Sequence, residues 1–507
     1  MGNVYGAFHR RSIDDRDGFW REQAALVEWH KPFDQVLDYS RPPFAKWFVG
    51  GLTNLCHNAV DRHLAARGDQ KALVFISTET DTEQSFTYRQ LHDEVNRCAA
   101  MMRALGVQRG DRVLLYMPMI PEAAFAMLAC ARLGAIHSVV FGGFASHSLA
   151  TRIEDARPKL IVSSDAGMRA GKVVRYKPLL DEAIALSSHK PDAVVLVDRR
   201  LDPECTRVPG RDHDWATLRD VHAGADVPVT WLESSEPSYI LYTSGTTGKP
   251  KGVQRDVGGY LVALAASMKH IYQGHAGETM FTTSDIGWVV GHSYIVYAPL
   301  IAGMTTIFYE GVPVRPDAGI WWKIVQDHRV TVMFSAPTAI RVLKKQDESF
   351  VTKHDLSSLR HLFLAGEPLD EPTHRWITGV LGRPVIDHYW QTETGWPMLT
   401  SVPGVEATPV KYGSPSFPAY GYDLRLFRED GSEAGADEKA VVGVVPPLPP
   451  GCLSTVWGDD DRFVKTYFSM FRDRLIYSSF DWGIRDADGY YFILGRTDDV
   501  INVAGHR

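Results

Sequence analysis

Apolar and polar residues alternate with two regular periods from residue 86 onward. Thr87 and Gln90 have the spacing of a helix capping box, and the apolar positions after them repeat every three to four residues up to Gly106. Short apolar runs between helical segments predict buried strands. The predicted strands are residues 113–117, 136–141, 239–242, 330–335, 361–364 and 384–388, and the predicted helices are residues 88–105, 121–133 and 337–345. This alternation is typical of parallel sheets covered by helices.

The pattern differs at both ends of the chain. Residues 1–70 are mixed in character, so we expect an irregular segment with short helices that wraps on a core formed elsewhere. After residue 406, Gly and Pro are frequent, and strand-like runs at 420–427 and 440–446 predict a smaller, β-rich subdomain. The expected parts are residues 1–70, paired α/β subdomains over 71–405, the β-rich subdomain over 406–494, and a hinge over 495–507.

Composition narrows the functional classes. The 507 residues correspond to roughly three units of ~150 residues. Lys and Arg number 54 against 61 Asp and Glu, a net charge of −7, whereas nucleic-acid-binding proteins usually carry a basic surplus. No apolar run approaches the ~20 residues of a membrane helix, and no signal peptide is expected. Five scattered cysteines without a CxxC pair are typical of free thiols in the cytoplasm. The oligomeric state is not predicted.

Residues 242–253, with the sequence YTSGTTGKPKGV, are the most informative segment. They follow a predicted strand, their glycines permit close backbone approach, and their hydroxyls, N–H groups and lysines suit a polyphosphate. A Walker A loop requires Ser or Thr after the Gly-Lys pair, but Pro250 follows Lys249, which argues against a P-loop kinase or ATPase. A flexible surface loop is the plain alternative, but it does not explain this order of residues after a buried strand.

This segment resembles the signature of the adenylate-forming superfamily, which includes acyl-CoA synthetases, adenylation domains of peptide synthetases and beetle luciferases. Further motifs follow in the family's order over nearly the whole chain. Residues 283–294 resemble the acetyl-CoA synthetase branch, and the chain as a whole is most similar to the propionate-activating members of that branch. Residues 365–368, 387–394 and 495–507 resemble its nucleotide and hinge motifs. The resemblance implies an α/β fold with two helix-flanked, mostly parallel sheets and a smaller, barrel-like subdomain.

The resemblance also implies a two-step reaction that uses ATP, Mg²⁺ and coenzyme A. A carboxylate attacks the α-phosphate of ATP to give acyl-AMP and pyrophosphate, and the CoA thiolate then displaces AMP. The implied catalytic groups are Thr246 and Lys249 at the β- and γ-phosphates, Thr392 at the α-phosphate, and Glu393 as a ligand of Mg²⁺. The plain alternative for Glu393 is a solvated loop acid.

The other implied nucleotide contacts form an adenine pocket and a ribose site. Asp481 is expected to accept the ribose hydroxyls with Arg496 nearby, although Phe480 and Asp481 stand where the family more often has Gly-Asp. The implied ATP-binding residues are Thr243, Ser244, Gly245, Thr246, Thr247, Gly248, Lys249, Gly366, Glu367, Pro368, Asp387, His388, Tyr389, Trp390, Gln391, Thr392, Asp481, Arg496 and Arg507.

Coenzyme A and the acyl group have separate implied sites. Arg169 and Lys172 match a basic pair that contacts the 3′-phosphate of CoA in acetyl-CoA synthetases, with a solvated basic loop as the alternative. The implied CoA-binding residues are Arg169, Ala170, Gly171, Lys172 and Gly505. The implied acyl pocket consists of Trp288, Val289, Val290, Ala365 and Trp390.

Two positions of this pocket bear on the substrate. Trp390 as a floor would exclude long chains, and Ala365 stands where acetate enzymes usually have Val, which leaves room for one more methylene, worth about 0.8 kcal/mol on burial. We therefore expect propionate as the preferred substrate and acetate as a slower one, with an acetyl-CoA synthetase as the alternative. If both residues are ordinary core residues, the pocket lies elsewhere.

Family members continue past the hinge residue Asp498 into a C-terminal lid, which carries a lysine that assists adenylation, whereas this sequence stops at Arg507. The expectation is a chain without the lid and with impaired turnover. A nucleotide-binding protein without catalysis and an amino-acid adenylation domain are the other classes. This sequence lacks the amino-binding Asp that an adenylation domain would have beside Trp288, and its CoA-type pair, Arg169 and Lys172, also argues against that class. The expected partners are small molecules, and neither nucleic acid nor membrane.

Overall fold

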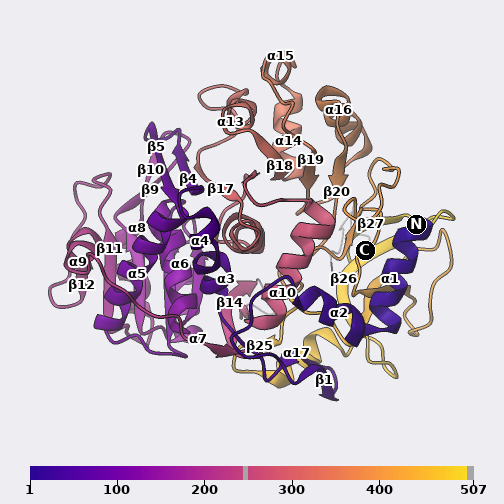
Figure 1. The fold of residues 1–507 in the computed structure, drawn as a ribbon, viewed down its shortest axis with the longest axis horizontal. Coiled ribbons are helices and arrows are strands. Elements are labelled where there is room, and N and C mark those ends of the chain that lie inside the picture. The colour runs from indigo at the N-terminus through magenta and orange to yellow at the C-terminus, as the bar shows by residue number, and fades with distance from the viewer. Residues whose placement is uncertain (244–248, 499–507) are drawn as a thin grey trace, which may run out of the picture.

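The computed structural model describes residues 1–243 and 249–498, and its first large sheet fills one side of the molecule (Figure 1). The strands, in spatial order, are β12 (Asp212–Asp214), β11 (Ala193–Val197), β8 (Leu160–Ser164), β6 (Arg112–Met117), β7 (Ile136–Phe141), β14 (Pro237–Thr243), β15 (Lys251–Asp256) and β25 (Thr455–Val456). The strands from β12 to β14 are parallel, β15 pairs antiparallel with β14, and β25 pairs antiparallel with β15. The covering helices are α5 (Tyr88–Ala104), α6 (Pro121–Leu133), α7 (Ser146–Ala156), α8 (Tyr176–Leu186) and α9 (Trp215–Val221).

The second large sheet is parallel except for one edge strand. Its strands, in spatial order, are β20 (Val385–Asp387), β19 (His361–Leu364), β18 (Val330–Ser335), β16 (Thr279–Thr282), β17 (Thr305–Glu310), β4 (Lys71–Ser77) and the antiparallel β5 (Thr82–Thr87). Helices α13 (Ile320–His328), α14 (Pro337–Lys344) and α16 (Glu371–Leu381) share an apolar core with one face of this sheet. The other face packs against α10 (Gly258–Ser267), the π-helices η2 (Met268–Tyr272) and η3 (His292–Tyr297), and α12 (Ala298–Ile301) in the main core.

The C-terminal part of the described chain forms a third, antiparallel sheet. Its strands are β23 (Asp423–Phe427), β24 (Ala440–Val445), β26 (Tyr477–Arg485) and β27 (Tyr491–Arg496), and α17 (Asp460–Tyr467) precedes β26. The N-terminal helices α1 (Asn3–Asp14) and α2 (Arg16–Ala24) lie beside this sheet (Figure 1). Tyr5 donates a hydrogen bond to the carbonyl of Pro418, at 2.7 Å, and Trp20 is fully buried. Residues of the N-terminal segment thus pack against and bond to residues from the C-terminal part of the chain.

The helix–strand alternation is confirmed with small shifts at the ends. The capping box of Thr87 and Gln90 is formed, and Gly106 follows the helix with φ +92°. The strand predicted to start at residue 420 begins only at Asp423, because Gly421 adopts a turn conformation with φ +86°. One element was not predicted: β1 (Gln35–Arg41) and β2 (Phe44–Val49) pair as a hairpin within the segment expected to be irregular.

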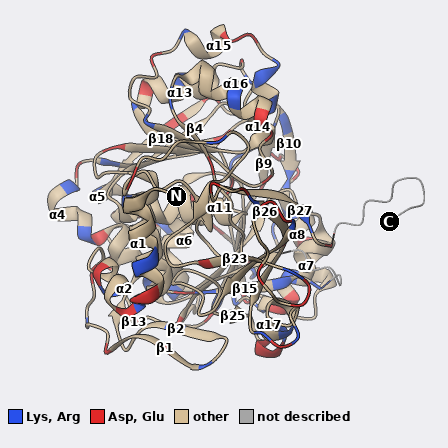
Figure 2. Ribbon diagram, turned by 90° about the vertical axis from the view of Figure 1, so that its right-hand side faces the viewer, with Lys and Arg blue, Asp and Glu red and all other residues tan. Residues whose placement is uncertain are grey.

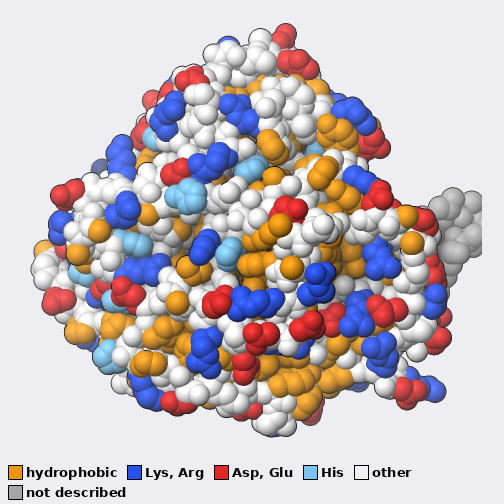
Figure 3. Space-filling view, turned by 45° about the vertical axis from the view of Figure 1, so that its right-hand side comes forward, with side chains coloured by type: hydrophobic (Ala, Val, Ile, Leu, Met, Phe, Trp, Pro, Cys, Tyr) orange, Lys and Arg blue, Asp and Glu red, His pale blue; other side chains and the backbone are white. Residues whose placement is uncertain are grey.

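Positive and negative side chains are intermixed in the views of the described residues that Figures 2 and 3 give. Lys and Arg alternate with Asp and Glu along the ribbon (Figure 2), and both signs are intermixed on the face that Figure 3 shows. All five cysteines are free thiols, as predicted, and four of them are buried. Among residues 1–243 and 249–498, no helix combines the length and the apolar character that crossing a bilayer requires.

Candidate functional site

A cavity of about 460 Å³ lies where β19 and β20 end beside β26 and β27. The C-terminal ends of parallel strands are where ligands bind in such sheets. The lining residues are Gly366, Glu367, Pro368, Leu369, Asp387, His388, Tyr389, Trp390, Gln391, Gly413, Pro415, Asp481, Ile493, Gly495 and Arg496. The structure therefore brings together both predicted adenine motifs and the two predicted ribose-site residues; we call this space the nucleotide cavity.

Two glycines keep the nucleotide cavity open. Gly366 has φ +107° and Gly495 has φ +137°, and a Cβ atom added at either position would meet no other atom within 4 Å. Any side chain at these positions would extend into free space and adopt a strained backbone conformation. The cavity thus has room and close backbone approach for a flat ring such as adenine.

Asp481 is fixed inside this cavity by two side chains of the 387–391 motif. Its Oδ2 accepts hydrogen bonds from the hydroxyl of Tyr389 and from Nε2 of Gln391, the latter at 3.1 Å. Arg496 Nη1 lies 4.0 Å from Oδ1. Burial raises the pKa of Asp481, and the Tyr389 hydrogen bond and the Arg496 charge oppose this shift. The carboxylate is held in one orientation, so it can accept hydrogen bonds from the hydroxyls of a sugar.

Phe480 shows how the chain accommodates its departure from the family pattern. It has φ +61°, a conformation that glycine adopts more easily than any other residue. The pairing register of β24 and β26 shifts next to it, and its carbonyl accepts a hydrogen bond from Thr497 N at 2.7 Å. The chain therefore holds a bulky residue at Phe480 in a backbone conformation that glycine adopts more easily.

Glu393 lies on the loop that continues from the nucleotide cavity. Its Oε2 accepts a hydrogen bond from the hydroxyl of Tyr467 at 2.7 Å, and the Lys251 ammonium lies 5.0 Å from the centre of the Tyr467 ring. Burial lowers the pKa of Lys251, and the charge of Glu393 opposes this shift. Within the described ranges, no group of three or more His, Cys, Asp or Glu side chains could hold a metal ion. A hard cation at Glu393 would thus need oxygens from a ligand, which is how Mg²⁺ binds beside phosphates.

The predicted phosphate loop is only partly described. Thr243 ends β14, and Lys249 precedes β15, with its side chain exposed. Arg462 fixes the backbone at this end, because Nη2 donates to the carbonyl of Lys249 at 2.6 Å and Nη1 donates to that of Pro250 at 3.1 Å. The predicted residues Ser244, Gly245, Thr246, Thr247, Gly248, Gly505 and Arg507 lie outside the described residues.

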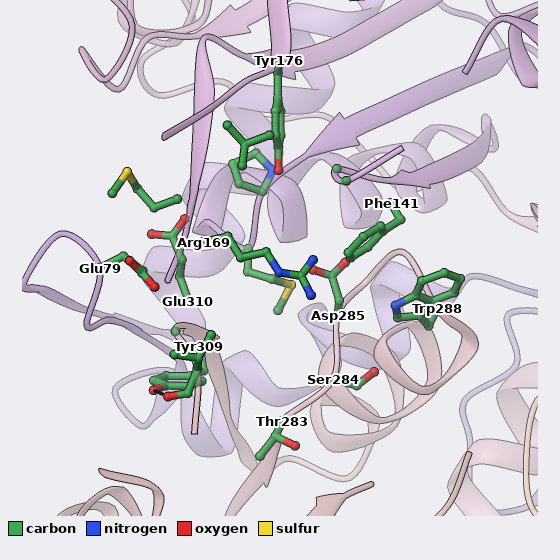
Figure 4. A pocket seen from close by; sticks show the side chains of 18 residues that line it. Glu79, Phe141, Arg169, Tyr176, Thr283, Ser284, Asp285, Trp288, Tyr309 and Glu310 are labelled. Atoms are coloured by element: carbon green, nitrogen blue, oxygen red, sulfur yellow. Dashed lines mark hydrogen bonds between the residues drawn. The ribbon is translucent and has the colours of Figure 1, made fainter. Parts of the chain in front are cut away.

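A second cavity, of about 320 Å³, lies between the two large sheets' strand ends and the hairpin of β9 (Ala166–Arg169) and β10 (Lys172–Arg175). Figure 4 shows the side chain of Arg169 extended across this space toward Asp285, with Phe141 and Trp288 beyond it. Burial raises the pKa of Asp285 to about 6, and the Gly287 amide and the Arg169 charge oppose the shift. We call this space the Arg169 cavity.

The tip of this hairpin is held by an acid that the sequence did not indicate. Ala170 and Gly171 both have positive φ, at +50° and +80°, and their N–H groups each donate to the carboxylate of Glu79 at 2.8 Å. Lys172 follows the tip and is exposed. The predicted CoA residues 169–172 therefore lie on one short hairpin, and only Arg169 lines the cavity.

The five predicted acyl-pocket residues do not line one cavity. Trp288 lines the Arg169 cavity, is 45% exposed and stacks on Phe141 with ring centres 5.1 Å apart. Trp390 lines the nucleotide cavity and meets Tyr294 edge to face at 5.5 Å. Ala365 is buried in the main core. Val289 is buried and Val290 is partly buried in the same core.

Tyr467 and Glu79 are the two contact residues that sequence reasoning missed. Tyr467 lies on α17, 74 positions from Glu393, and Glu79 lies in the β4–β5 turn, 91 positions from Ala170. Neither residue belongs to a local motif, so no pattern in the sequence connects it to its partner. Only the tertiary structure brings these side chains to the candidate sites.

Comparisons with known proteins identify the family. The model of AMP-binding enzymes matches residues 60–443, and the model of the acetyl-coenzyme A synthetase N-terminus matches residues 5–59. A propionate–CoA ligase of Salmonella typhimurium is 63% identical over 504 residues, which span 99% of this chain and 80% of that protein. An acetyl-coenzyme A synthetase of Beijerinckia indica is 43% identical over 517 residues, which span 99% of this chain and 78% of that protein.

A more distant relative extends the same relationship. The human mitochondrial acyl-CoA synthetase short-chain family member 3 is 42% identical over 514 residues, which span the whole of this chain and 74% of that protein. Identity at this level over nearly the full chain is shared with enzymes whose names specify short-chain acyl-CoA synthesis. The chain therefore belongs to the family of AMP-binding enzymes, the adenylate-forming superfamily, in its acetyl-CoA synthetase branch.

Proposed function

We propose that the chain activates a short-chain carboxylate, with propionate preferred over acetate, first to acyl-AMP and then to acyl-CoA, with release of pyrophosphate and AMP. The observation that carries the proposal is the nucleotide cavity, whose walls are both predicted adenine motifs together with Asp481 and Arg496. The 63% identity with a propionate–CoA ligase supports the choice of acid. ATP, Mg²⁺ and coenzyme A are the cofactor set of this family.

For the first step, we assign the phosphates to the segment between β14 and β15 and to the loop of Thr392 and Glu393. Thr246, Thr247 and Lys249 are proposed to hold the β- and γ-phosphates and Thr392 the α-phosphate. Glu393, held by Tyr467 at 2.7 Å, is proposed to bind Mg²⁺ with phosphate oxygens completing the coordination. Adenylation then proceeds by neutralisation of phosphate charge and in-line positioning of the carboxylate.

For the second step, we assign the Arg169 cavity to coenzyme A. Arg169 and Lys172 are proposed to contact its 3′-phosphate, and Gly505 to line the path of its pantetheine arm. The support is that Arg169 extends into a cavity of about 320 Å³ whose wall includes Trp288 of the predicted acyl pocket (Figure 4).

The acid specificity is assigned to Ala365 and Trp390. Ala365 is buried in the main core, and Trp390 lines the nucleotide cavity beside Tyr294. A pocket with Ala at one wall and Trp as its floor fits three carbons better than two or four. Discrimination by one methylene amounts to about 1–3 kcal/mol. An acetyl-CoA synthetase is the second candidate, favoured by the match of residues 5–59 to the N-terminus of that enzyme.

The test is ATP–pyrophosphate exchange with acetate, propionate, butyrate and glycine side by side, followed by thioester formation on addition of CoA. We expect exchange with propionate above acetate, little with butyrate and none with glycine. Exchange highest with acetate would identify an acetyl-CoA synthetase, and nucleotide binding without any exchange would identify a binding protein. Exchange with glycine would identify an amino-acid adenylation domain.

The remaining assignments follow from composition. Free cysteines favour a reducing compartment, so we propose a cytoplasmic location. The proposed partners are the small-molecule substrates, and the mixed surface charge gives no support for a nucleic-acid partner. The division into residues 1–70, 71–405, 406–494 and 495–507, with the hinge at Asp498, is retained as a proposal.

A further inference from the structure

Arg255, on β15, is the largest charged side chain that the structure buries completely. Its exposed fraction is 0%, and within the described residues no carboxylate oxygen lies within 4.0 Å of it. A guanidinium in this position is costly unless all its donors are satisfied, and an apolar residue of similar size would usually pack there at lower free energy. The hydrogen-bond acceptors of Arg255 indicate what a buried cation contributes at this position.

The acceptors of Arg255 come from three separate segments. Nη2 donates to the carbonyl of Thr392, and Nη1 donates at 3.0 Å to the carbonyls of both Glu393 and Gly451. Nε donates to the hydroxyl of Tyr239 at 3.1 Å. One planar side chain thus joins the two strands that flank the predicted phosphate loop to the loop that carries Thr392 and Glu393.

The surroundings of the guanidinium hold it in this plane. It lies 5.4 Å from the ring centre of Tyr239 and 5.5 Å from that of Tyr260. Gly395 comes so close that an added Cβ would lie 2.9 Å from Arg255 Cζ. The loop that carries Thr392 and Glu393 therefore packs directly on the guanidinium. Positive charge in a water-excluded region acts over a longer range than it does in solvent.

We propose that Arg255 is a positioning residue for adenylation: it fixes the Thr392–Glu393 backbone against strands β14 and β15, and its buried charge favours the polyphosphate of Mg·ATP. The inference rests on the proposed function. Arg255 does not need to contact the substrate. It holds the backbone carbonyls of Thr392 and Glu393 and thereby orients the side chains of these two residues. Acyl-AMP keeps the α-phosphate assigned to Thr392 but lacks the β- and γ-phosphates that complete the proposed Mg²⁺ site at Glu393. The proposal therefore predicts that the ATP-dependent step depends on Arg255 much more strongly than the CoA-dependent step.

The test compares Arg255→Met and Arg255→Lys with Tyr239→Phe as the matched control. Tyr239→Phe removes one acceptor of the same guanidinium and leaves the contacts to Thr392 and Glu393 in place. Each variant is assayed in two half-reactions: propionate-dependent ATP–pyrophosphate exchange, and formation of propionyl-CoA from supplied propionyl-AMP and CoA. The second assay bypasses Mg·ATP, so it reports whether the domain is folded and can still bind an adenylate.

We expect Arg255→Met to raise KM for Mg·ATP and lower exchange by a combined factor of about 10–100, the range for loss of charge-assisted hydrogen bonds. The rate from propionyl-AMP should change less than about threefold, Arg255→Lys should fall between Met and the parent, and Tyr239→Phe should stay within about twofold. Equal losses in both half-reactions, or an unchanged KM for Mg·ATP, would overturn the proposal.

If Arg255→Met does not fold, the same split in Arg255→Lys decides the question. Loss confined to exchange supports the proposal, and equal loss in both assays contradicts it. Absence of exchange in the parent with every acid would defeat the proposed function itself. Exchange in the parent with an unaffected Arg255→Met would defeat only the role of Arg255.

Discussion

The nucleotide cavity and the Arg169 cavity are built in different ways. The first is formed mainly by two short runs, 366–369 and 387–391, that continue directly from β19 and β20. The second draws its wall from six separate stretches of chain, from Glu79 to Val312. The polar groups of the first are bonded to one another, as in the Asp481–Tyr389 pair, whereas Arg169 extends into open space (Figure 4).

The difference indicates that the nucleotide cavity is the more rigid of the two and that the Arg169 cavity is the more adaptable. Strand ends fix backbone positions within a sheet, so the nucleotide cavity is preorganised before any ligand arrives. The hairpin of residues 166–175 is a two-stranded unit held at its tip by Glu79 alone among the contacts described above. Changes at the nucleotide side should therefore affect the first chemical step, and changes at the hairpin should affect CoA affinity alone.

The largest effect is expected from Glu393→Gln, which removes the proposed Mg²⁺ ligand while keeping the acceptor for Tyr467. We expect ATP–pyrophosphate exchange to fall by about 100-fold or more, since a Lewis-acid cation supplies several kcal/mol of charge stabilisation. Lys249→Ala should weaken Mg·ATP binding without unfolding the domain, because its side chain is exposed. Calorimetry with Mg·ATP measures both; unchanged affinity in both variants would contradict the phosphate assignment.

Tyr467→Phe is the control for this prediction. It removes the 2.7 Å hydrogen bond to Glu393 and leaves the carboxylate. We expect a loss of about tenfold in exchange, near the value of one charge-assisted hydrogen bond. A loss of exchange as large as that of Glu393→Gln would mean that the hydroxyl of Tyr467 contributes as much to exchange as the Glu393 carboxylate does, which would contradict the role of Glu393 as the metal ligand.

The second prediction concerns the other cavity. Arg169→Ala should raise KM for CoA by about 10–100-fold, because it removes a charge-assisted contact to a phosphate. Propionate-dependent ATP–pyrophosphate exchange should not change, since this step does not involve CoA. Arg175→Ala is the matched control: it lies on the same hairpin, but its guanidinium binds Asp202 at 2.9 Å. A loss of exchange in Arg169→Ala would show that the two cavities are not independent.

The third prediction tests whether Ala365 contacts the acyl chain. Ala365→Val adds two methyl groups to a buried position, and such overpacking costs about 1–3 kcal/mol. Propionate should lose roughly ten- to a hundredfold in kcat/KM while acetate changes little. Butyrate should be poor in the parent and poorer in the variant. Equal losses for both acids would mean that Ala365 does not touch the acyl chain.

Sequence patterns located the nucleotide side far better than the CoA side, for a physical reason. Residues 366–368 and 387–391 are contiguous, and a run that continues a buried strand has its position fixed by the sheet. Glu79, Asp285 and Tyr309 reach the Arg169 cavity from three separate segments of the chain, so only the tertiary fold brings them together. The hairpin of β1 and β2 was missed because its Pro42-Pro43 turn interrupts the apolar pattern.

The smallest expected effect comes from Asp285→Asn, and its sign depends on pH. The Asp285 carboxyl has a pKa of about 6, raised by burial, so it is mostly charged at pH 7.5 and mostly neutral at pH 5. Its negative charge partly cancels that of Arg169 and repels the phosphates of CoA. In the parent, Asp285 Oδ1 accepts a hydrogen bond from the Gly287 N–H at 2.7 Å. The Asn side chain keeps an oxygen for this hydrogen bond and removes only the charge. At an effective dielectric constant near 20, an interaction over several ångströms amounts to roughly 1 kcal/mol after screening, or about a fivefold lower KM for CoA at pH 7.5. At pH 5 the variant and the parent should have the same KM, because the parent has taken up the proton.

The ratio of the two KM values, measured from pH 5 to 8, cancels the titration of CoA itself. A ratio that stays at one throughout would mean that Asp285 does not face the bound phosphates, and a higher KM in the variant at pH 7.5 would mean that the carboxylate orients Arg169 and does not oppose it.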